Sequence, residues 1–141
     1  FVPKPFTPFQ WMPMADMKKT AAALKYIRNT LKKERNIEVL TESTKESYLQ
    51  GILARGDRRI SQLLYESHKS GGIKAFKQVI KQHHIDENFY LYRQREIDEL
   101  LPWDTLDMGV KKDYFIHELE MAKQQKPTMK CFDNCKRCGV C

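Results

Sequence analysis

Glycine and proline residues divide this chain of 141 residues into short segments, and that constrains its fold more than any other feature. Prolines at positions 3, 5, 8 and 13 exclude a helix from the opening segment, because proline lacks the amide hydrogen and restricts the residue before it. Glycines at 56, 71 and 72 and prolines at 102 and 127 end the later segments. Any helices between these points are therefore short.

Apolar residues recur at helical spacing between the breaks. Ser43 and Glu46 resemble a capping box, and Asp57 is placed to cap the following helix. The expected helices run from residue 17 onward, from about 44 to 54, from 58 to about 68, from 73 to 80, and to about 125. The apolar positions Ile60, Leu63 and Leu64 are expected to share one face of the third helix.

Two segments are expected to be extended. The β-branched residues of "NIEVLTE", at 36–42, alternate loosely and predict a short strand, and the opening phrase is expected to hold a strand end before a rigid loop. The predicted fold class is therefore mainly α with short β elements. Hydrophobic residues make up 41% of the chain and no apolar run is long enough to span a bilayer, so we expect a soluble, cytoplasmic protein without membrane contact.

All four cysteines lie in the last eleven residues, "CFDNCKRCGVC", with the spacing C-x3-C-x2-C-x2-C. Disulfides are rare in cytosolic proteins and would close small strained loops here, so thiolate ligation of a metal is the better interpretation. Zinc sites usually combine two separated pairs, whereas such a dense run resembles those that bind iron-sulfur clusters. Both metals remain alternatives. The predicted ligands are Cys131, Cys135, Cys138 and Cys141.

Basic residues near the cysteines support this interpretation. Lys130, Lys136 and Arg137 are placed to favour deprotonated thiols, and Gly139 allows the backbone to approach a metal closely. No catalytic residue is identified elsewhere, because the chain shows neither a nucleophile with its base nor a glycine-rich phosphate loop. Asp104 with Asp107, and His117 with Glu118 and Glu120, are interpreted as turn-stabilising and solvated residues.

The net charge of +7 is concentrated in one segment, since seven basic residues and two acidic residues lie between positions 15 and 35. Lys18, Lys25 and Lys32 fall on one flank of the apolar stripe of the expected first helix. A basic flank can contact phosphates, although a solvated face is the commoner reason for such a run. The alternative function is therefore a helical RNA-binding module with a zinc knuckle.

Several phrases, taken in order, resemble one family over nearly the whole chain. They are "FVPKPFTPFQW", "LARGDRR", "FYLYRQREIDELLPWDTLDMGV" and "CKRCGVC". Together they resemble the C-terminal part of cobalamin-binding radical S-adenosylmethionine (radical SAM) proteins. In that family an N-terminal cobalamin-binding domain precedes a partial (β/α) barrel, whose C-x3-C-x2-C triad holds a four-iron cluster that cleaves S-adenosylmethionine.

The resemblance implies three parts: the C-terminal end of the barrel at 1–42, a helical accessory region at 43–126, and a Cys-rich metal or cluster-binding tail at 127–141. The cysteines then form an auxiliary site, because the radical triad follows the first barrel strand rather than a helical region. This implies a fragment of a larger enzyme, whose partner is the rest of its own polypeptide. Without the core triad, the fragment is expected to be inactive alone.

Overall fold

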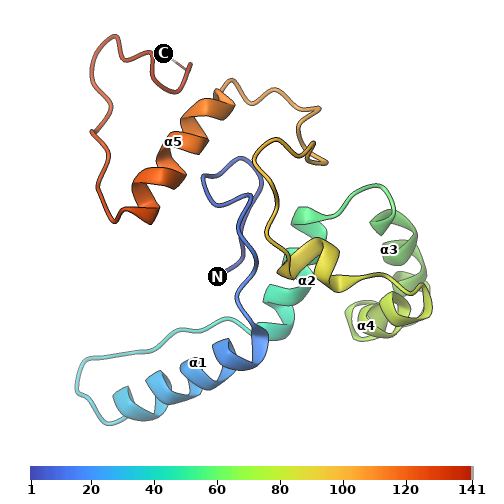
Figure 1. Cartoon of the computed structure of the whole chain (residues 1–141). Helices are drawn as coiled ribbons and strands as arrows, with labels where there is room; N and C mark the ends of the chain where they lie inside the picture. Colours follow the sequence, from blue (N-terminus) through green and yellow to red (C-terminus); the bar gives the residue numbers. More distant parts are fainter. Residues whose placement is uncertain (141) are drawn as a thin grey trace. The chain divides into compact units, whose positions relative to one another are not determined.

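The computed structural model describes residues 1–140, and within them it contains only helices and irregular segments (Figure 1). Five are α-helices and one, η1, is a π-helix. Their bounds are α1 Met17–Leu31, α2 Thr44–Arg55, α3 Ile60–Lys69, α4 Ile73–Gln82, η1 Asn88–Tyr92 and α5 Lys112–Lys123. The expected helices are confirmed to within a few residues, because each is specified by local spacing and by its terminating glycine or proline.

The expectation of β elements is wrong. No strand occurs within residues 1–140, so this chain contains neither the end of a (β/α) barrel nor an edge strand. Residues 37–43 are irregular, although Ile37 and Val39 favour a strand locally. A strand is stabilised by pairing with a neighbour, and this segment has no other strand beside it in the described part of the chain.

The chain divides into two compact units, which are described separately. The first comprises residues 1–2 and 13–93, and the second comprises residues 3–12 and 94–141. The first unit has a core contributed by α2, α3, α4, η1 and the segment before α1. Its buried members are Met14, Tyr48, Ile52, Ile60, Leu63, Phe76, Val79, Ile80, Tyr90 and Leu91.

Helices α3 and α4 pack against each other and lie side by side in Figure 1. Gly71 and Gly72 connect them with positive φ angles of 117° and 72°, a conformation that favours glycine. Leu63 is 1% exposed in this core, whereas its neighbour Leu64 is 44% exposed. Leu63 and Leu64 both lie on α3 as expected, but only Leu63 is buried in the core.

Helix α2 packs against η1. Gly51 allows the two helices to approach closely, because a Cβ at that position would clash with Leu91 Cδ2, at a distance of 2.8 Å. The buried Arg55 donates from Nε to the carbonyl oxygen of Tyr90 at 2.8 Å. At the start of α2, the Ser43 hydroxyl accepts a hydrogen bond from the Lys45 amide at 3.2 Å, as the capping pattern predicts.

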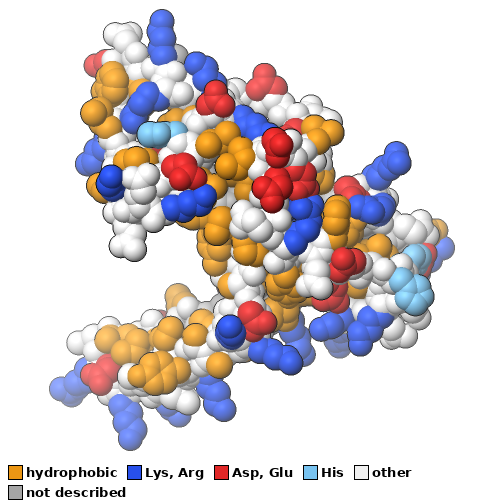
Figure 2. Space-filling model, in the orientation of Figure 1, with side chains coloured by type: hydrophobic (Ala, Val, Ile, Leu, Met, Phe, Trp, Pro, Cys, Tyr) orange, Lys and Arg blue, Asp and Glu red, His pale blue; other side chains and the backbone are white. Residues whose placement is uncertain are grey.

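Helix α1 is the most exposed helix of the first unit. It contacts α2, yet none of its residues is buried. Asp16 caps it by accepting from the Lys19 amide at 2.7 Å. Figure 2 shows Lys and Arg side chains along α1 together with hydrophobic side chains on its surface. No helix in the described part of the chain is long and apolar enough to cross a membrane.

The second unit has a smaller core that joins the proline-rich loop to α5. Its buried members are Trp11, Leu101, Trp103, Phe115 and Leu119. The buried Gln10 accepts a hydrogen bond from Trp103 Nε1 at 2.7 Å, and Arg95 donates its amide to the Trp11 carbonyl at 2.9 Å. Trp11 is therefore fully buried and Phe6 is partly buried against this core, whereas Phe9 remains 37% exposed.

Candidate thiol site near the C-terminus

The cysteine segment follows α5 without regular secondary structure. Cys131, Cys135 and Cys138 lie within the described residues, and the fourth predicted ligand, Cys141, lies outside them. The amide of Cys135 donates to the Phe132 carbonyl at 3.0 Å, which forms a tight turn between the first two cysteines. Asn134 adopts a φ of 62° in this turn, and Gly139 adopts a φ of 92° further along.

Arg137 organises this turn. Its Nε donates to Cys135 Sγ at 3.3 Å, and its Nη2 donates to the carbonyl oxygens of Met129 at 2.7 Å and Lys130 at 3.0 Å. The guanidinium also lies 5.8 Å from the centre of the Phe132 ring. One side chain therefore holds both ends of the loop that carries Cys131 and Cys135.

The same contacts favour the thiolate form of Cys135. The hydrogen bond from Arg137 is the main cause that lowers the pKa of Cys135, and a hydrogen bond from Cys131 adds to it. In turn, the bond to Cys135 raises the pKa of Arg137. Cys135 is only 2% exposed, whereas Cys131 is exposed and Cys138 is half-buried. The structure thus brings Cys131 and Cys135 together around one guanidinium.

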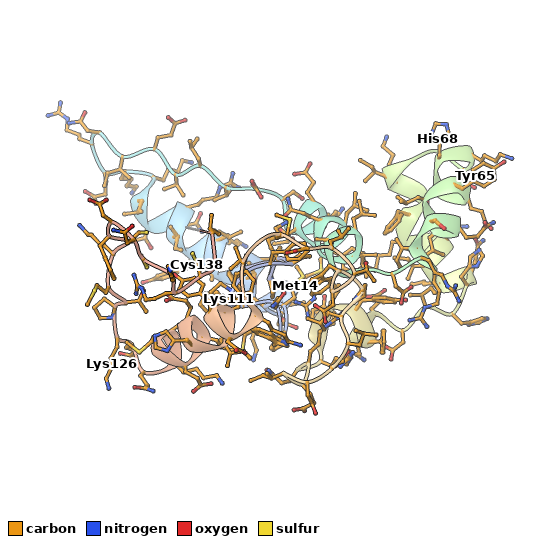
Figure 3. All side chains as sticks on the ribbon, turned by 90° about the horizontal axis from the view of Figure 1, so that it is seen from above. Met14, Tyr65, His68, Lys111, Lys126 and Cys138 are labelled. Carbon is orange, nitrogen blue, oxygen red and sulfur yellow. The ribbon has the colours of Figure 1, made fainter. Side chains whose placement is uncertain are left out.

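Cys138 is positioned by a different contact. Its carbonyl oxygen accepts a hydrogen bond from the Lys111 amide at 2.8 Å, and Figure 3 shows both residues near the start of α5. The next residue, Gly139, lies against the Lys111 side chain, where a Cβ would be 3.0 Å from Cγ. The tail is therefore attached to the loop that precedes α5.

Tyr114 and Glu118 on α5 also lie near the tail, and the sequence analysis predicted no role there for either residue. The Thr128 hydroxyl donates to Glu118 Oε2 at 2.9 Å. Burial, and then the charge of Glu118, raise the pKa of Tyr114. Glu118 had been interpreted as part of a solvated face, which is wrong for this residue. The spacing of Glu118 along the helix could not reveal this contact, because its partner, Thr128, lies beyond the end of α5.

The described residues do not contain a preformed set of metal ligands. Between residues 1 and 140, no three side chains of the His, Cys, Asp and Glu types converge on one point. The donor types nevertheless suit a soft metal, because the three cysteines are soft donors and Arg137 lowers the pKa of the Cys135 thiol. Comparison with protein-family models, curated proteins and solved structures gave no match.

Proposed function

We propose that this chain is the C-terminal, metal-binding part of a radical SAM enzyme of the cobalamin-binding family. Cys131, Cys135, Cys138 and Cys141 hold an auxiliary iron-sulfur cluster or a zinc ion. The observation that carries the proposal is the run of four thiols within eleven residues, in which Cys135 accepts a hydrogen bond from Arg137. Adjacent soft donors beside a cation suit either metal.

Residues around the cysteines have different roles at the proposed metal site. Arg137 lowers the pKa of Cys135 and closes the loop that carries Cys131, and Lys111 holds the backbone of Cys138 near α5. When bound, an iron-sulfur cluster would supply electron transfer, and zinc would supply a structural tie. Ligation by all four thiols leaves no open position, which favours either role over substrate binding at the metal.

The remainder of the enzyme lies elsewhere in the polypeptide under this proposal. That remainder supplies the four-iron cluster, S-adenosylmethionine, the barrel and the cobalamin-binding domain, and it is the main partner of this chain. The chain itself is a helical accessory part that works in the cytoplasm and is inactive alone. Because residues 1–42 form no strand, the chain contributes no part of the barrel.

Metal analysis of the full chain tests the proposal. Protein purified anaerobically is expected to contain iron with sulfide, or zinc, in a stoichiometric amount. Replacing Cys135 or Cys138 by serine should remove most of that metal, because each is a ligand. The neighbouring Met129→Leu variant should retain it, since Met129 is exposed and offers no thiolate. Only trace metal in the parent protein, or full metal in both serine variants, would refute the site.

A second candidate function is RNA binding through α1. The observation that favours it is that the cations of α1, among them Lys18 and Lys25, are exposed, and so is Lys32 directly after the helix. Replacing these three lysines by glutamine should weaken RNA binding and reduce its dependence on salt.

A control variant can make the same change of charge on other helices, at Lys69, Lys74 and Lys81, which are also exposed. An equal loss of RNA binding in the two variants would indicate that net charge alone is responsible. Absence of binding at low salt would exclude this function.

A further inference from the structure

A cavity of about 270 Å³ lies in the second unit, away from the cysteines. It opens between the proline-rich loop and the segment from Asp104 to Phe115. Phe6, Met108, Val110 and Phe115 supply apolar walls. Small-molecule sites usually combine such walls with a few fixed polar groups, and this cavity has the volume for a ligand of about ten to fifteen non-hydrogen atoms.

One wall of the cavity is held rigidly. Gln10 is 3% exposed, and its Oε1 accepts hydrogen bonds from the Phe6 amide at 3.1 Å and from Trp103 Nε1 at 2.7 Å. Phe6 has a φ of 55°, which is unusual for a bulky residue and persists only when the surroundings impose it. The Gln10 bond fixes this backbone and thereby places the Phe6 side chain in the cavity wall.

The polar groups of the cavity carry an excess of negative charge. Asp107 Oδ1 accepts from the Gly109 amide at 2.7 Å, and no cationic nitrogen of residues 1–140 lies within 4.0 Å of this carboxylate. Asp104 Oδ2 accepts from the Leu101 amide at 2.9 Å and lies 4.0 Å from Lys112 Nζ. The cavity lining therefore carries two carboxylates and one ammonium group, which pairs with Asp104, so one oxygen of Asp107 remains available to a ligand.

We propose that this cavity binds a small organic cation, in which an ammonium group is attached to an apolar body about the size of an aromatic ring. The ammonium pairs with Asp107, and the apolar body lies between the rings of Phe6 and Phe115. The aromatic rings add attraction for the positive charge. The site uses none of the cysteines, so it goes beyond the proposed metal function and is independent of it.

The test is a titration of the full chain by nuclear magnetic resonance, with three probes of similar shape. They are 2-phenylethylammonium, the neutral 2-phenylethanol, and the anionic 3-phenylpropanoate. The cation is expected to give saturable shifts of the Met108 and Val110 methyl signals. The neutral probe should bind more weakly, and the anion should not saturate the site.

Two variants test the role of the charge. Asp107→Asn keeps the Oδ1 acceptor for the Gly109 amide and removes only the charge, so it should weaken binding of the cation by about two- to fivefold, as for partly exposed ion pairs. Asp98→Asn makes the same change at an exposed residue outside the cavity and should leave binding unchanged. Equal binding of all three probes, no saturable shift, or an equal effect of both variants would overturn the proposal.

Discussion

Asp57 connects the turn between α2 and α3 to the π-helix η1. Its Oδ1 accepts from the Arg59 amide at 3.0 Å, its Oδ2 lies 2.5 Å from Arg59 Nη2, and the Tyr90 hydroxyl donates to the carboxylate at 3.2 Å. Replacing Asp57 by asparagine removes the charge and retains one oxygen acceptor. We expect this change to destabilise the first unit at neutral pH.

The expected loss follows from the pKa of Asp57. The hydrogen bond from Arg59 is the main cause that lowers this pKa from 3.8 to about 2. A shift of this size corresponds to at most roughly 2 kcal/mol of folding free energy. Arg59 is 58% exposed, so solvent screening reduces this to about 1 kcal/mol. That is about 5 °C in melting temperature for a unit of this size.

The dependence on pH has a definite sign. Because the folded-state pKa is lowered, the stabilisation is complete above pH 4 and is lost as the pH falls toward 2. Thermal unfolding followed by circular dichroism at several pH values measures it, with Asp98→Asn as the control. Asp57→Asn should be less stable than the parent chain at pH 7 and equal to it near pH 2. A difference that stays constant with pH, or no difference at pH 7, would refute this reasoning.

Four further substitutions test the two cores and the tail. Leu63→Ala should cost about 2–5 kcal/mol in urea unfolding, whereas Leu64→Ala should cost less than about 1 kcal/mol, because only Leu63 is fully buried. Trp103→Phe removes the buried indole hydrogen bond to Gln10 and should lower the free energy of unfolding of the second unit by about 2–3 kcal/mol. Hydrogen exchange of the amides in α5 measures this loss. Gly139→Ala should detach the tail from the loop before α5, because its φ of 92° strains alanine; faster alkylation of the cysteines in the metal-free chain would report it.

Much of the local structure could be predicted because its causes are local. Apolar spacing located the helices, and Ser43 caps α2 as expected. Asp57 accepts from the Arg59 amide but does not cap α3, whose N-cap residue is Arg59 and has no side-chain cap hydrogen bond. The strand expected at 36–42 failed because a strand depends on a partner that spacing does not reveal. Apolar spacing likewise did not show that Leu63 is buried while its neighbour Leu64 is exposed, because burial depends on contacts with other elements.

The candidate sites likewise include features that the sequence reveals and features that depend on contacts between distant segments. The cysteine spacing and the proximity of Arg137 are visible in the sequence because these residues are neighbours along the chain. The cavity beside Asp107 could not be predicted, because it joins the loop containing Phe6 to residues about a hundred positions later. The hydrogen bond between Thr128 and Glu118 could not be predicted either, because the sequence does not show how the chain turns back after α5.

The sequence by itself determined the approximate positions of the helices and the concentration of basic charge between residues 15 and 35, and it predicted a thiol site near the C-terminus. Each of these depends on residues within a few positions of one another. Only the tertiary structure decided which apolar residues are buried, that no strand forms within residues 1–140, and that the proline-rich loop helps to line a cavity. These outcomes depend on contacts between distant segments, which periodicity and spacing do not specify.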